Sequence, residues 1–351
     1  MDKVLLSVIR FLYGNELYYI DNYYFDKDLR PIVEKLKIYF LGSGEIAVPV
    51  LEACVKAPAL ELVGVGTQPD RAAGRRGKLS PTPVGRAAEA SGLAPDKPEN
   101  VNAPDFLAKL RRLAPDMVVV VSFGQLLRQD LLELPRRGCV NVHASLLPRY
   151  RGASPIVQAI LRRDAETGVC FMRMEKGLDT GAVYRVLKFP LDGGEYADAL
   201  ELKLGELAGR EVAATLVGIA AGEYTPVPQD DAAATVCRKI RKEDAWIDWR
   251  RSAAEIDAMV RAYHPWPGAR CRVLRKNGGS VLTLRKVEVL PEQTLAPGEV
   301  DIPDRRTLIV GCGEGALKIS ELTPESSKTM DAAAFLNGLR GEEIGFPLPD
   351  C

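Results

Sequence analysis

From residue 36 onward, strand-like and helix-like segments alternate, and this alternation limits the fold more than any other feature of the sequence. Apolar runs bounded by turn residues predict the strands, and a helical period of apolar residues predicts the helices. The predicted strands are 36–42, 60–67, 116–124 and 138–144. The predicted helices are 46–55, a helix from residue 84, and 105–114. Strands that alternate with helices in this way predict a mostly parallel α/β sheet.

The pattern changes in the second half of the chain. Paired strands are predicted at 168–174 and 182–191, and a long amphipathic helix at about 195–221. After a Pro- and Asp-rich stretch come a helix and several short strands with glycine turns, which predict a small β-barrel. The predicted divisions are an N-terminal extension at 1–35, a catalytic domain at 36–224, a linker at 225–240 and a barrel at 241–351.

The first 35 residues contain no alanine, in a chain that is otherwise rich in it. This break suggests that they have a separate origin, as an extension of unknown role or as the product of a misassigned start, with Leu36 as the alternative. A helix packed on the body of the protein is a third interpretation.

Overall composition excludes several classes of protein. The 47 basic and 47 acidic side chains balance, which excludes a protein that binds nucleic acid with its whole surface. Seven scattered cysteines without a C-x-x-C pair fit a reducing cytoplasm and predict no metal site. The sequence has no run of 18 apolar residues, so no membrane span is expected.

The stretch NVHASLLPRYRGASPI, which begins at Asn141, carries the strongest chemical signal. Asn141 and His143 are two residues apart, and on a strand such residues point to the same side. The end of a sheet strand is where open α/β sheets bind their ligands. An amide N–H and an imidazole there could together hold a developing oxyanion.

Asp179 lies between glycines in GLDTGAV, after the strand predicted at 168–174. A carboxylate there could reach the imidazole and accept a proton. It could also serve only to initiate the turn. Spacing alone does not decide between these roles.

A glycine turn, Gly42-Ser43-Gly44, follows the first strand and with Ala47 fits the dinucleotide-binding pattern G-x-G-x-x-G/A. Asp70 stands where a ribose ligand would lie. Any tight strand-to-helix turn also favours small residues, because they permit close packing. The packing interpretation is favoured, since the other chemistry-bearing residues lie elsewhere.

Further segments match a known family in order. They are FLGSGEIAVPVLEA, TQPDRAAGRRGKLSPTPV, VVVVSFGQLL, NVHASLLPRYRGASPI, ETGVCFMRMEKGLDTGAV, RKIRKEDAWIDW and RAYHPWPGA. On these segments the chain from Leu36 resembles the methionyl-tRNA formyltransferase family. The N-x-H-x-S-L-L-P-x-x-R-G core is shared with other formyl-folate transferases and indicates the chemistry. The basic loop and C-terminal segments indicate the tRNA enzyme. The departures are SFGQLL where a tyrosine is more frequent, Ala72 where a proline is usual, and His264 where an asparagine is frequent.

This resemblance implies a Rossmann-like formyltransferase domain followed by an OB-like β-barrel, in a monomer. It implies transfer of the formyl group of 10-formyltetrahydrofolate to the α-amine of methionine on initiator methionyl-tRNA. Asn141, His143 and Asp179 match the catalytic trio, in which Asn141 and protonated His143 hold the oxyanion. Residues that match the folate contacts are Ser145, Leu146, Leu147, Pro148, Phe123, Gly124, Gln125, Leu126 and Leu127.

Basic side chains gather in two places that suit a tRNA partner. The loop at 71–78 holds basic residues and no acid, and its glycines predict flexibility that is lost on binding. Residues 235–286 contain 13 basic and five acidic side chains, a net of +8, whereas residues 287–351 contain five and 12, a net of −7. A basic stripe on a small barrel suits contact with a nucleic-acid backbone. The candidate tRNA contacts are Arg71, Arg75, Arg76, Lys78, Arg270, Arg272, Arg275 and Lys276. Trp246, Trp249 and Trp266 are interpreted as packing residues.

Three other functions remain open at this stage. A formyl-folate transferase acting on a sugar amine or on glycinamide ribonucleotide would share the trio, but it would need neither basic region. A nicotinamide-dependent oxidoreductase would use the turn at Gly42. A non-catalytic tRNA-binding protein would use the barrel alone.

Overall fold

The computed structural model describes residues 35–73, 77–276 and 278–349, together with five short strands among residues 4–32. These strands are β1 (Val4–Leu6), β2 (Ile9–Tyr13), β3 (Glu16–Ile20), β4 (Tyr23–Phe25) and β5 (Pro31–Ile32). Strand β2 pairs antiparallel with β3, and β4 pairs antiparallel with β1 and β5. The described parts of the first 35 residues are therefore strands, and not the helix that the sequence left open.

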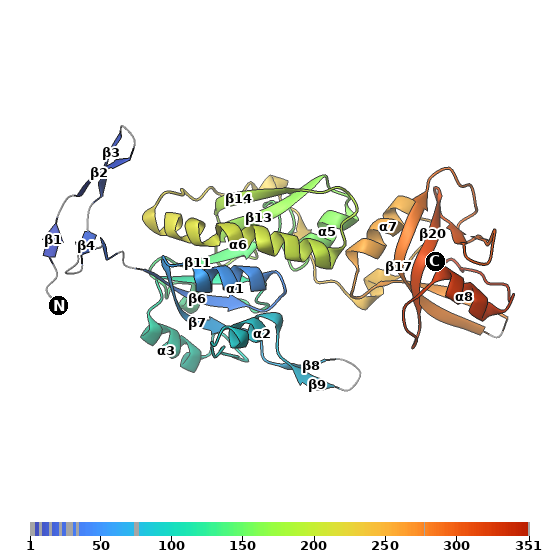
Figure 1. Ribbon diagram of the computed structural model, residues 1–351, viewed down its shortest axis with the longest axis horizontal. Helices are drawn as coiled ribbons and strands as arrows, with labels where there is room; N and C mark the ends of the chain where they lie inside the picture. The colour runs from blue at the N-terminus through green and yellow to red at the C-terminus, as the bar shows by residue number, and fades with distance from the viewer. Residues whose placement is uncertain are drawn as a thin grey trace. The chain divides into compact units, whose positions relative to one another are not determined.

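One six-stranded sheet has the order β14-β13-β11-β10-β6-β7 (Figure 1). Its strands are β6 (Leu36–Gly42), β7 (Leu60–Gly66), β10 (Met117–Val121), β11 (Cys139–His143), β13 (Glu166–Arg173) and β14 (Val183–Pro190). Strand β6 runs parallel to β7 and β10, and β14 adds an antiparallel edge to β13. Every residue of β10 is buried, as its β-branched MVVVV sequence requires in a sheet covered on both faces. The predicted α/β class is confirmed.

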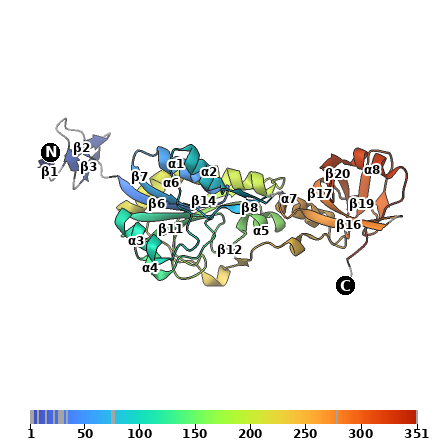
Figure 2. The same ribbon diagram turned by 90° about the horizontal axis from the view of Figure 1, so that it is seen from below.

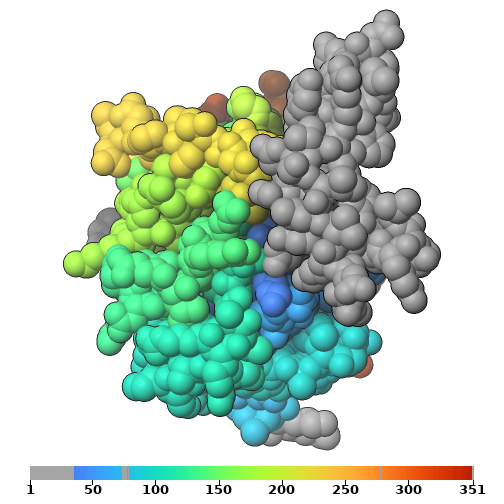
Figure 3. Space-filling model, turned by 90° about the vertical axis from the view of Figure 1, so that its left-hand side faces the viewer, coloured from blue at the N-terminus to red at the C-terminus, as the bar shows by residue number. Residues whose placement is uncertain are grey.

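Helices lie between most of these strands along the chain, and one helix follows the last strand. They are α1 (Ala47–Lys56), α2 (Pro83–Ala90), α3 (Pro104–Leu113), α4 (Gln129–Leu132), α5 (Pro155–Leu161) and α6 (Ala197–Ala221). The period of α3 buries Phe106, Leu107 and Leu110, and its other side lies on the surface in Figure 3. Ala114 ends α3 in the left-handed conformation. The sequence predicted α1, α2, α3 and α6 and missed α4 and α5.

The C-terminal part is an antiparallel, curled sheet that forms a half-barrel, with strand order β16-β17-β20-β19-β18 (Figure 2). Its strands are β16 (Ala269–Arg275), β17 (Gly278–Leu290), β18 (Val300–Asp301), β19 (Leu308–Gly311), β20 (Ala316–Pro324) and β21 (Met330–Asp331), and its helices are α7 (Ala253–Ala262) and α8 (Ala332–Leu339). Alternate residues of β16 face a core that includes Trp249, Phe335 and Leu317. The predicted strands of this region are present, and α8 was not predicted.

Two segments contain more structure than their sequences indicated. The basic loop is a hairpin of β8 (Arg71–Ala73) and β9 (Lys78–Ser80). The stretch predicted as a linker contains the 3₁₀ helix η1 (Asp231–Ala233) and β15 (Val236–Cys237), and a second 3₁₀ helix, η2 (Lys242–Ala245), follows it. Strand β15 pairs parallel with β12 (Arg151–Gly152).

The chain is divided into two compact units, and each draws on separated stretches of sequence. The first comprises Met1–Gly44, Val50–Val140 and Gly209–Thr225. The second comprises Glu45–Pro49, Asn141–Ala208 and Pro226–Cys351. The predicted catalytic trio therefore lies within the second unit.

Candidate active site

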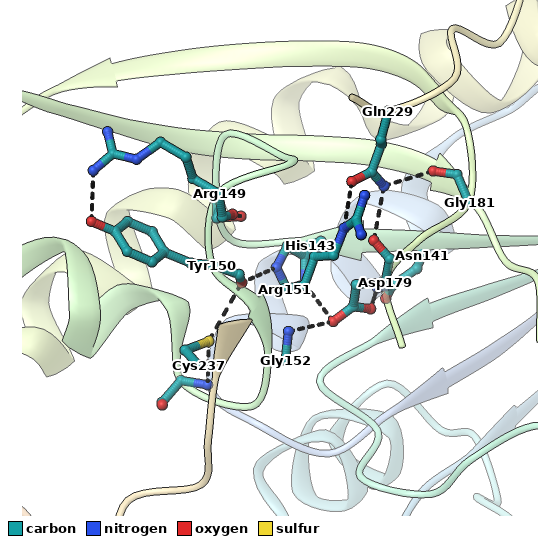
Figure 4. Close-up of polar contacts among 12 residues, drawn as sticks. Asn141, His143, Arg149, Tyr150, Arg151, Gly152, Asp179, Gly181, Gln229 and Cys237 are labelled. Atoms are coloured by element: carbon teal, nitrogen blue, oxygen red, sulfur yellow. Dashed lines mark hydrogen bonds and ion pairs between the residues drawn. The ribbon is translucent and has the colours of Figure 1, made fainter. Parts of the chain in front are cut away.

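Asn141 and His143 occupy the end of β11, a strand in which every residue is buried. Asn141 is 9 % exposed and His143 is 6 % exposed, although polar residues are mostly found at the surface. Figure 4 shows both of them directed toward Asp179. The i, i+2 spacing therefore places an amide and an imidazole side by side, as the sequence predicted.

Asp179 joins them from the turn between β13 and β14. Its Oδ1 accepts a hydrogen bond from Asn141 Nδ2 (3.3 Å), and its Oδ2 accepts one from the backbone N–H of Gly152 (2.8 Å). Asp179 Oδ2 also lies 3.6 Å from His143 Nδ1. These contacts bring the three predicted catalytic residues together. They favour the functional interpretation of Asp179, which spacing had left open.

The backbone at Asp179 has a φ of +52°, in the left-handed region that L-residues seldom adopt. Such conformations persist only where the surroundings restrain them, and they gather at functional sites. Gly181 restricts the same turn, because a Cβ there would stand 1.8 Å from the carbonyl oxygen of Arg173. The turn is thus specified by its tight packing on β13.

The backbone fixes the tautomer of His143. Its Nε2 lies 3.0 Å from the carbonyl oxygen of Tyr150. A carbonyl can only accept, so Nε2 carries a hydrogen, and in the neutral ring Nδ1 presents its lone pair on the side of Asp179. When His143 is protonated, Nδ1 becomes a donor on that same side.

Tyr150 is itself held in place. Its hydroxyl donates to Asp164 Oδ2 (2.8 Å) and accepts from Arg149 Nη2 (2.7 Å). Burial and the neighbouring Asp164 carboxylate raise the pKa of Tyr150 to about 12. The carbonyl that orients His143 therefore belongs to a residue whose ring is anchored by an ion-paired cluster.

Sequence reasoning missed Gln229, which contacts the Asp179 turn, and the Arg151–Asp231 pair behind it. The side-chain amide of Gln229 donates to the carbonyl oxygens of Asp179 (2.8 Å) and Gly181 (2.7 Å). Its Oε1 accepts from Arg151 Nε (2.9 Å), and Arg151 also pairs with Asp231 (2.7 Å). Arg151 stands in the quoted motif without an assigned role, and Gln229 lies in the Pro- and Asp-rich stretch. A short polar stretch of this kind has no periodicity that could have revealed its contacts.

The residues predicted to contact folate lie in two places. In the turn after β11, Ser145 is fully buried and its hydroxyl donates to the carbonyl of Arg149 (2.6 Å). That bond belongs to the turn itself. Leu147, on the same turn, packs against Cys170, Met172 and Val183.

After β10, Phe123 and Leu127 are buried, whereas Leu126 is 76 % exposed. The Gln125 amide is tied to the loop before α3, donating to Pro98 O (3.0 Å) and accepting from the N–H of Val101 (2.8 Å). This leaves Gly124, with a φ of +86°, as an exposed stretch of bare backbone in the segment.

The glycine turn after β6 is hydrogen-bonded to neighbouring segments of the protein. The Ser43 hydroxyl donates to the carbonyl of Phe123 (3.2 Å) and accepts from the N–H of Gln68 (3.1 Å). Asp70, the candidate ribose ligand, forms an ion pair with Lys97 (2.8 Å). These bonds support the packing interpretation of the turn.

The start of α1 supports the same conclusion. Glu201 Oε1 of α6 accepts a hydrogen bond from the N–H of Ile46 (3.3 Å), just before α1 begins at Ala47. Burial raises the pKa of Glu201. Dinucleotide-binding folds place a pyrophosphate at the corresponding helix N-terminus. An acidic side chain there disfavours a phosphate, which counts against the nicotinamide-dependent alternative.

The candidate tRNA contacts differ in what surrounds them. Arg71 is exposed on β8, Lys78 begins β9, and Arg75 and Arg76 lie outside the described residues. On β16, Arg272 is exposed. Lys276, just beyond β16, is exposed as well.

All three arginines of β16 lie over aromatic rings, and Arg272 is 5.9 Å from the centre of the Trp246 ring. The Arg270 guanidinium lies 4.8 Å from the centre of the Trp246 ring, and that of Arg275 lies 5.2 Å from Phe335. Trp249 is fully buried, as predicted, but Trp246 and Trp266 are 37 % and 55 % exposed. The burial of Trp249 fits the packing interpretation, and for the partly exposed Trp246 and Trp266 that interpretation stays a prediction.

Most of the chain is similar in sequence to known proteins. A family signature described as "Formyl transferase" matches residues 36–216, and one described as "Formyl transferase, C-terminal domain" matches residues 239–340. The methionyl-tRNA formyltransferase of Geobacter metallireducens is 41 % identical over 307 residues, which cover 88 % of this chain and 97 % of that protein. The chain belongs to the methionyl-tRNA formyltransferase family. The Halorhodospira halophila member is 42 % identical over 304 residues, covering 87 % of this chain and 96 % of its own.

Solved structures show that the fold extends beyond the methionyl-tRNA formyltransferases. The sugar 3N-formyltransferase WlaRD, crystallised with dTDP and 5-N-formyl-THF, aligns with a TM-score of 0.60 at 17 % identity, covering 84 % of this chain and 100 % of its own. HypX from Aquifex aeolicus in complex with tetrahydrofolic acid aligns with a TM-score of 0.59 at 18 % identity. The alignment covers 87 % of this chain and 47 % of HypX. The methionyl-tRNA formyltransferase from Clostridium thermocellum aligns with a TM-score of 0.50 at 14 % identity. The alignment covers 74 % of this chain and 95 % of that protein.

Membership in the methionyl-tRNA formyltransferase family makes this chain a folate-dependent formyltransferase that serves translation. The predicted family, fold and chemistry are thereby confirmed. Within the described residues, no group of three or more His, Cys, Asp and Glu side chains could hold a metal ion. None of the described helices is long and apolar enough to cross a membrane.

Proposed function

We propose that this chain transfers the formyl group of 10-formyltetrahydrofolate to the α-amine of methionine on initiator methionyl-tRNA. The observation that carries the proposal is the convergence of Asn141, His143 and Asp179 in a chain with methionyl-tRNA formyltransferase relatives. The donor set fits a formyl donor, since a formyl oxygen needs hydrogen-bond donors and a departing amine needs a proton.

Asn141 supplies a donor that does not titrate. One N–H of its amide is held by Asp179 Oδ1, which fixes the plane of the group. The second N–H then donates to the formyl oxygen as the methionine amine attacks the formyl carbon and negative charge develops. Fixed donors of this kind stabilise the transition state because they need no reorganisation during the reaction.

His143 and Asp179 handle charge and protons. Protonated His143 donates from Nδ1 to the same oxygen, and the Asp179 carboxylate lies 3.6 Å from that nitrogen. The reaction forms one C–N bond to the methionine nitrogen and breaks the bond between the formyl carbon and N10. The amine gives up one proton, Asp179 accepts it, and N10 receives it as it departs.

The remaining assignments follow the same proposal. Residues 36–224 perform catalysis and residues 241–351, with the β8–β9 hairpin, bind the tRNA, in a cytoplasmic monomer. The two segments Ser145–Pro148 and Phe123–Leu127 contact the folate. The exposed backbone at Gly124 and the exposed side chain of Leu126 suit contact with a flat ring.

The test uses 10-formyltetrahydrofolate labelled in its formyl group, with initiator methionyl-tRNA as acceptor. Labelled formyl-methionine is expected, and its formation should be lost in His143→Ala and Asp179→Ala variants that still fold. A dTDP-amino sugar and glycinamide ribonucleotide serve as parallel acceptors. Formylation of either one without formylation of the tRNA would contradict the proposal. Near-full transfer by a folded His143→Ala or Asp179→Ala variant would refute the assignment of the trio.

A further inference from the structure

We infer that Gln229 is a positioning residue for formyl transfer, and that residues 226–237, here called the return segment, are part of the active site. The inference rests on the proposed function of the trio. Gln229 follows Asp179 by 50 residues in the chain, yet its side chain bonds the backbone of the Asp179 turn (Figure 4).

The Asp179 turn needs an external restraint. Its φ of +52° is unfavourable for aspartate, and its side chain accepts from the amide of Asn141 and the N–H of Gly152. Gln229 Nε2 bonds two carbonyls of the turn, one from Asp179 and one from Gly181. Bonds on both sides of Thr180 hold the backbone in the conformation that aims the carboxylate at His143.

The Gln229 amide is itself oriented. Arg151 Nε donates to its Oε1 (2.9 Å), which fixes which end of the amide faces the turn. Arg151 begins β12, and the N–H of the next residue, Gly152, donates to the Asp179 carboxylate. The same two-residue strand therefore supports Asp179 twice, directly through Gly152 and indirectly through Gln229.

The return segment is anchored at both of its ends. Val227 exchanges two backbone hydrogen bonds with Val183 (2.8 and 2.9 Å), and Val183 is the first residue of β14. At the other end, β15 pairs with β12, and Thr235 accepts from the N–H groups of Tyr150 and Arg151 (both 2.8 Å). Gln229 is thus carried on a chain segment that is fixed to β14 at one end and to β12 at the other.

The geometry separates two roles that Gln229 could have. If it acts through the Asp179 turn, loss of its N–H donors matters. If it only holds Arg151, loss of its Oε1 acceptor matters. Gln229→Glu keeps the acceptor for Arg151 and removes the donors, whereas Gln229→Met keeps the shape and removes both.

The experiment compares steady-state formyl transfer to initiator methionyl-tRNA by the full-length protein and both variants. Both should lose kcat by on the order of 10²-fold, since a displacement of about 1 Å of a catalytic group has that effect. The KM for each substrate should stay within about threefold, because a residue that acts only through the Asp179 turn adds nothing to ground-state binding. Gln293, half-buried in the loop after β17, receives the same two substitutions as a matched control and should keep the wild-type kcat.

Three outcomes would overturn the inference. The first is a Gln229→Glu enzyme with wild-type kcat beside an impaired Gln229→Met enzyme, which would assign the residue to Arg151 alone. The second is a rise in KM without a fall in kcat. The third is a fall in kcat matched by loss of the folded fraction in thermal unfolding. If the wild-type protein itself transfers no formyl group to the tRNA, the proposed function fails, which separates that failure from these three.

Discussion

At the scale of single residues, the site depends on a few side chains whose second contacts fix their direction. Asn141 is held by Asp179, His143 by the carbonyl of Tyr150, and Asp179 by the N–H of Gly152. Each side chain keeps a group for the substrate: the second N–H of Asn141, Nδ1 of His143 and the carboxylate of Asp179. The oxyanion donors are thus preorganised before either substrate arrives.

Asn141→Ala should show the value of one such donor. The variant loses an oxyanion contact that does not titrate, so kcat should fall by roughly 10²–10³. Single-turnover formyl transfer by the folded variant checks this, and a rate near that of the wild-type protein would contradict the assigned role.

Gly152→Ala should damage both folding and catalysis. Gly152 has a φ of +117°, and a Cβ there would stand 2.2 Å from the carbonyl oxygen of Cys237. Pushing β12 away from β15 also moves the N–H of residue 152, which donates a hydrogen bond to Asp179. We expect a loss of about 1–3 kcal/mol in the free energy of unfolding and a clear fall in kcat.

Gly222→Ala is the matched control for that substitution. Gly222 also has a positive φ, of +80°, but a Cβ there meets no atom within 4 Å. Its stability should fall through backbone strain alone and its kcat should stay at the wild-type value. Equal kcat losses in both variants would contradict the explanation.

How much of the site the sequence could reveal depends on the separation of its parts along the chain. Asn141 and His143 share one strand, so a period of two predicts that they share a face. Asp179 stands 38 residues beyond Asn141, and no local pattern shows that its turn folds back on β11. Gln229 lies further still, in a stretch whose composition resembles a linker. Tertiary pairing of that stretch with β12, rather than any local preference, gives it structure.

At the scale of elements, local sequence predicted the regular ones well because their burial is periodic. The short elements were not predicted, for physical reasons. Helix α5 begins at Pro155 and has only seven residues, too few for an apolar period to show. The hairpin of β8 and β9 has three residues in each strand, and its glycines and arginines are typical of a loop. Elements of this size take their structure from what they contact.

Helix α7 offers a test at this scale. Ser252 and Glu255 form a capping box, in which each side chain accepts from the other's backbone N–H. The N–H and hydroxyl of Ser252 hold the pKa of Glu255 below its usual value of 4.5. A lowered folded-state pKa means that the ionised carboxylate stabilises the protein above its usual pKa, and that this contribution is lost as pH falls through the folded pKa.

Glu255→Gln should therefore lower the urea midpoint relative to wild type at pH 7, and the difference should shrink at about pH 3. Equilibrium unfolding at the two pH values measures it. A difference that stays constant with pH would show that the charge contributes nothing to the cap.

At the scale of the whole molecule, the balanced charge conceals an uneven distribution. The net of +8 over residues 235–286 is followed by a net of −7 over residues 287–351. On β16 the inward positions are apolar and the outward ones include Arg270 and Arg272, so the strand's alternation presents its positive charge to solvent.

Arg272→Ala should weaken tRNA binding in a salt-dependent way. Loss of one phosphate contact reduces the slope of log K against log salt by about 0.7–0.9. Binding of initiator tRNA measured across salt concentrations checks this. Arg306→Ala, which removes an exposed arginine from the acidic region, should leave the slope unchanged. Equal slopes for wild type and Arg272→Ala would place the tRNA backbone elsewhere.

The pairing of β12 with β15 also sets the order in which the site can form during synthesis. A ribosome makes the chain from its N-terminus, and the complete trio has emerged once Asp179 is out. Gln229 follows 50 residues later, and β15 after it. A nascent chain arrested between these points carries every catalytic side chain but lacks the segment that restrains the Asp179 turn. Formyl transfer should therefore begin only after Cys237 has left the exit tunnel, well after the catalytic residues themselves.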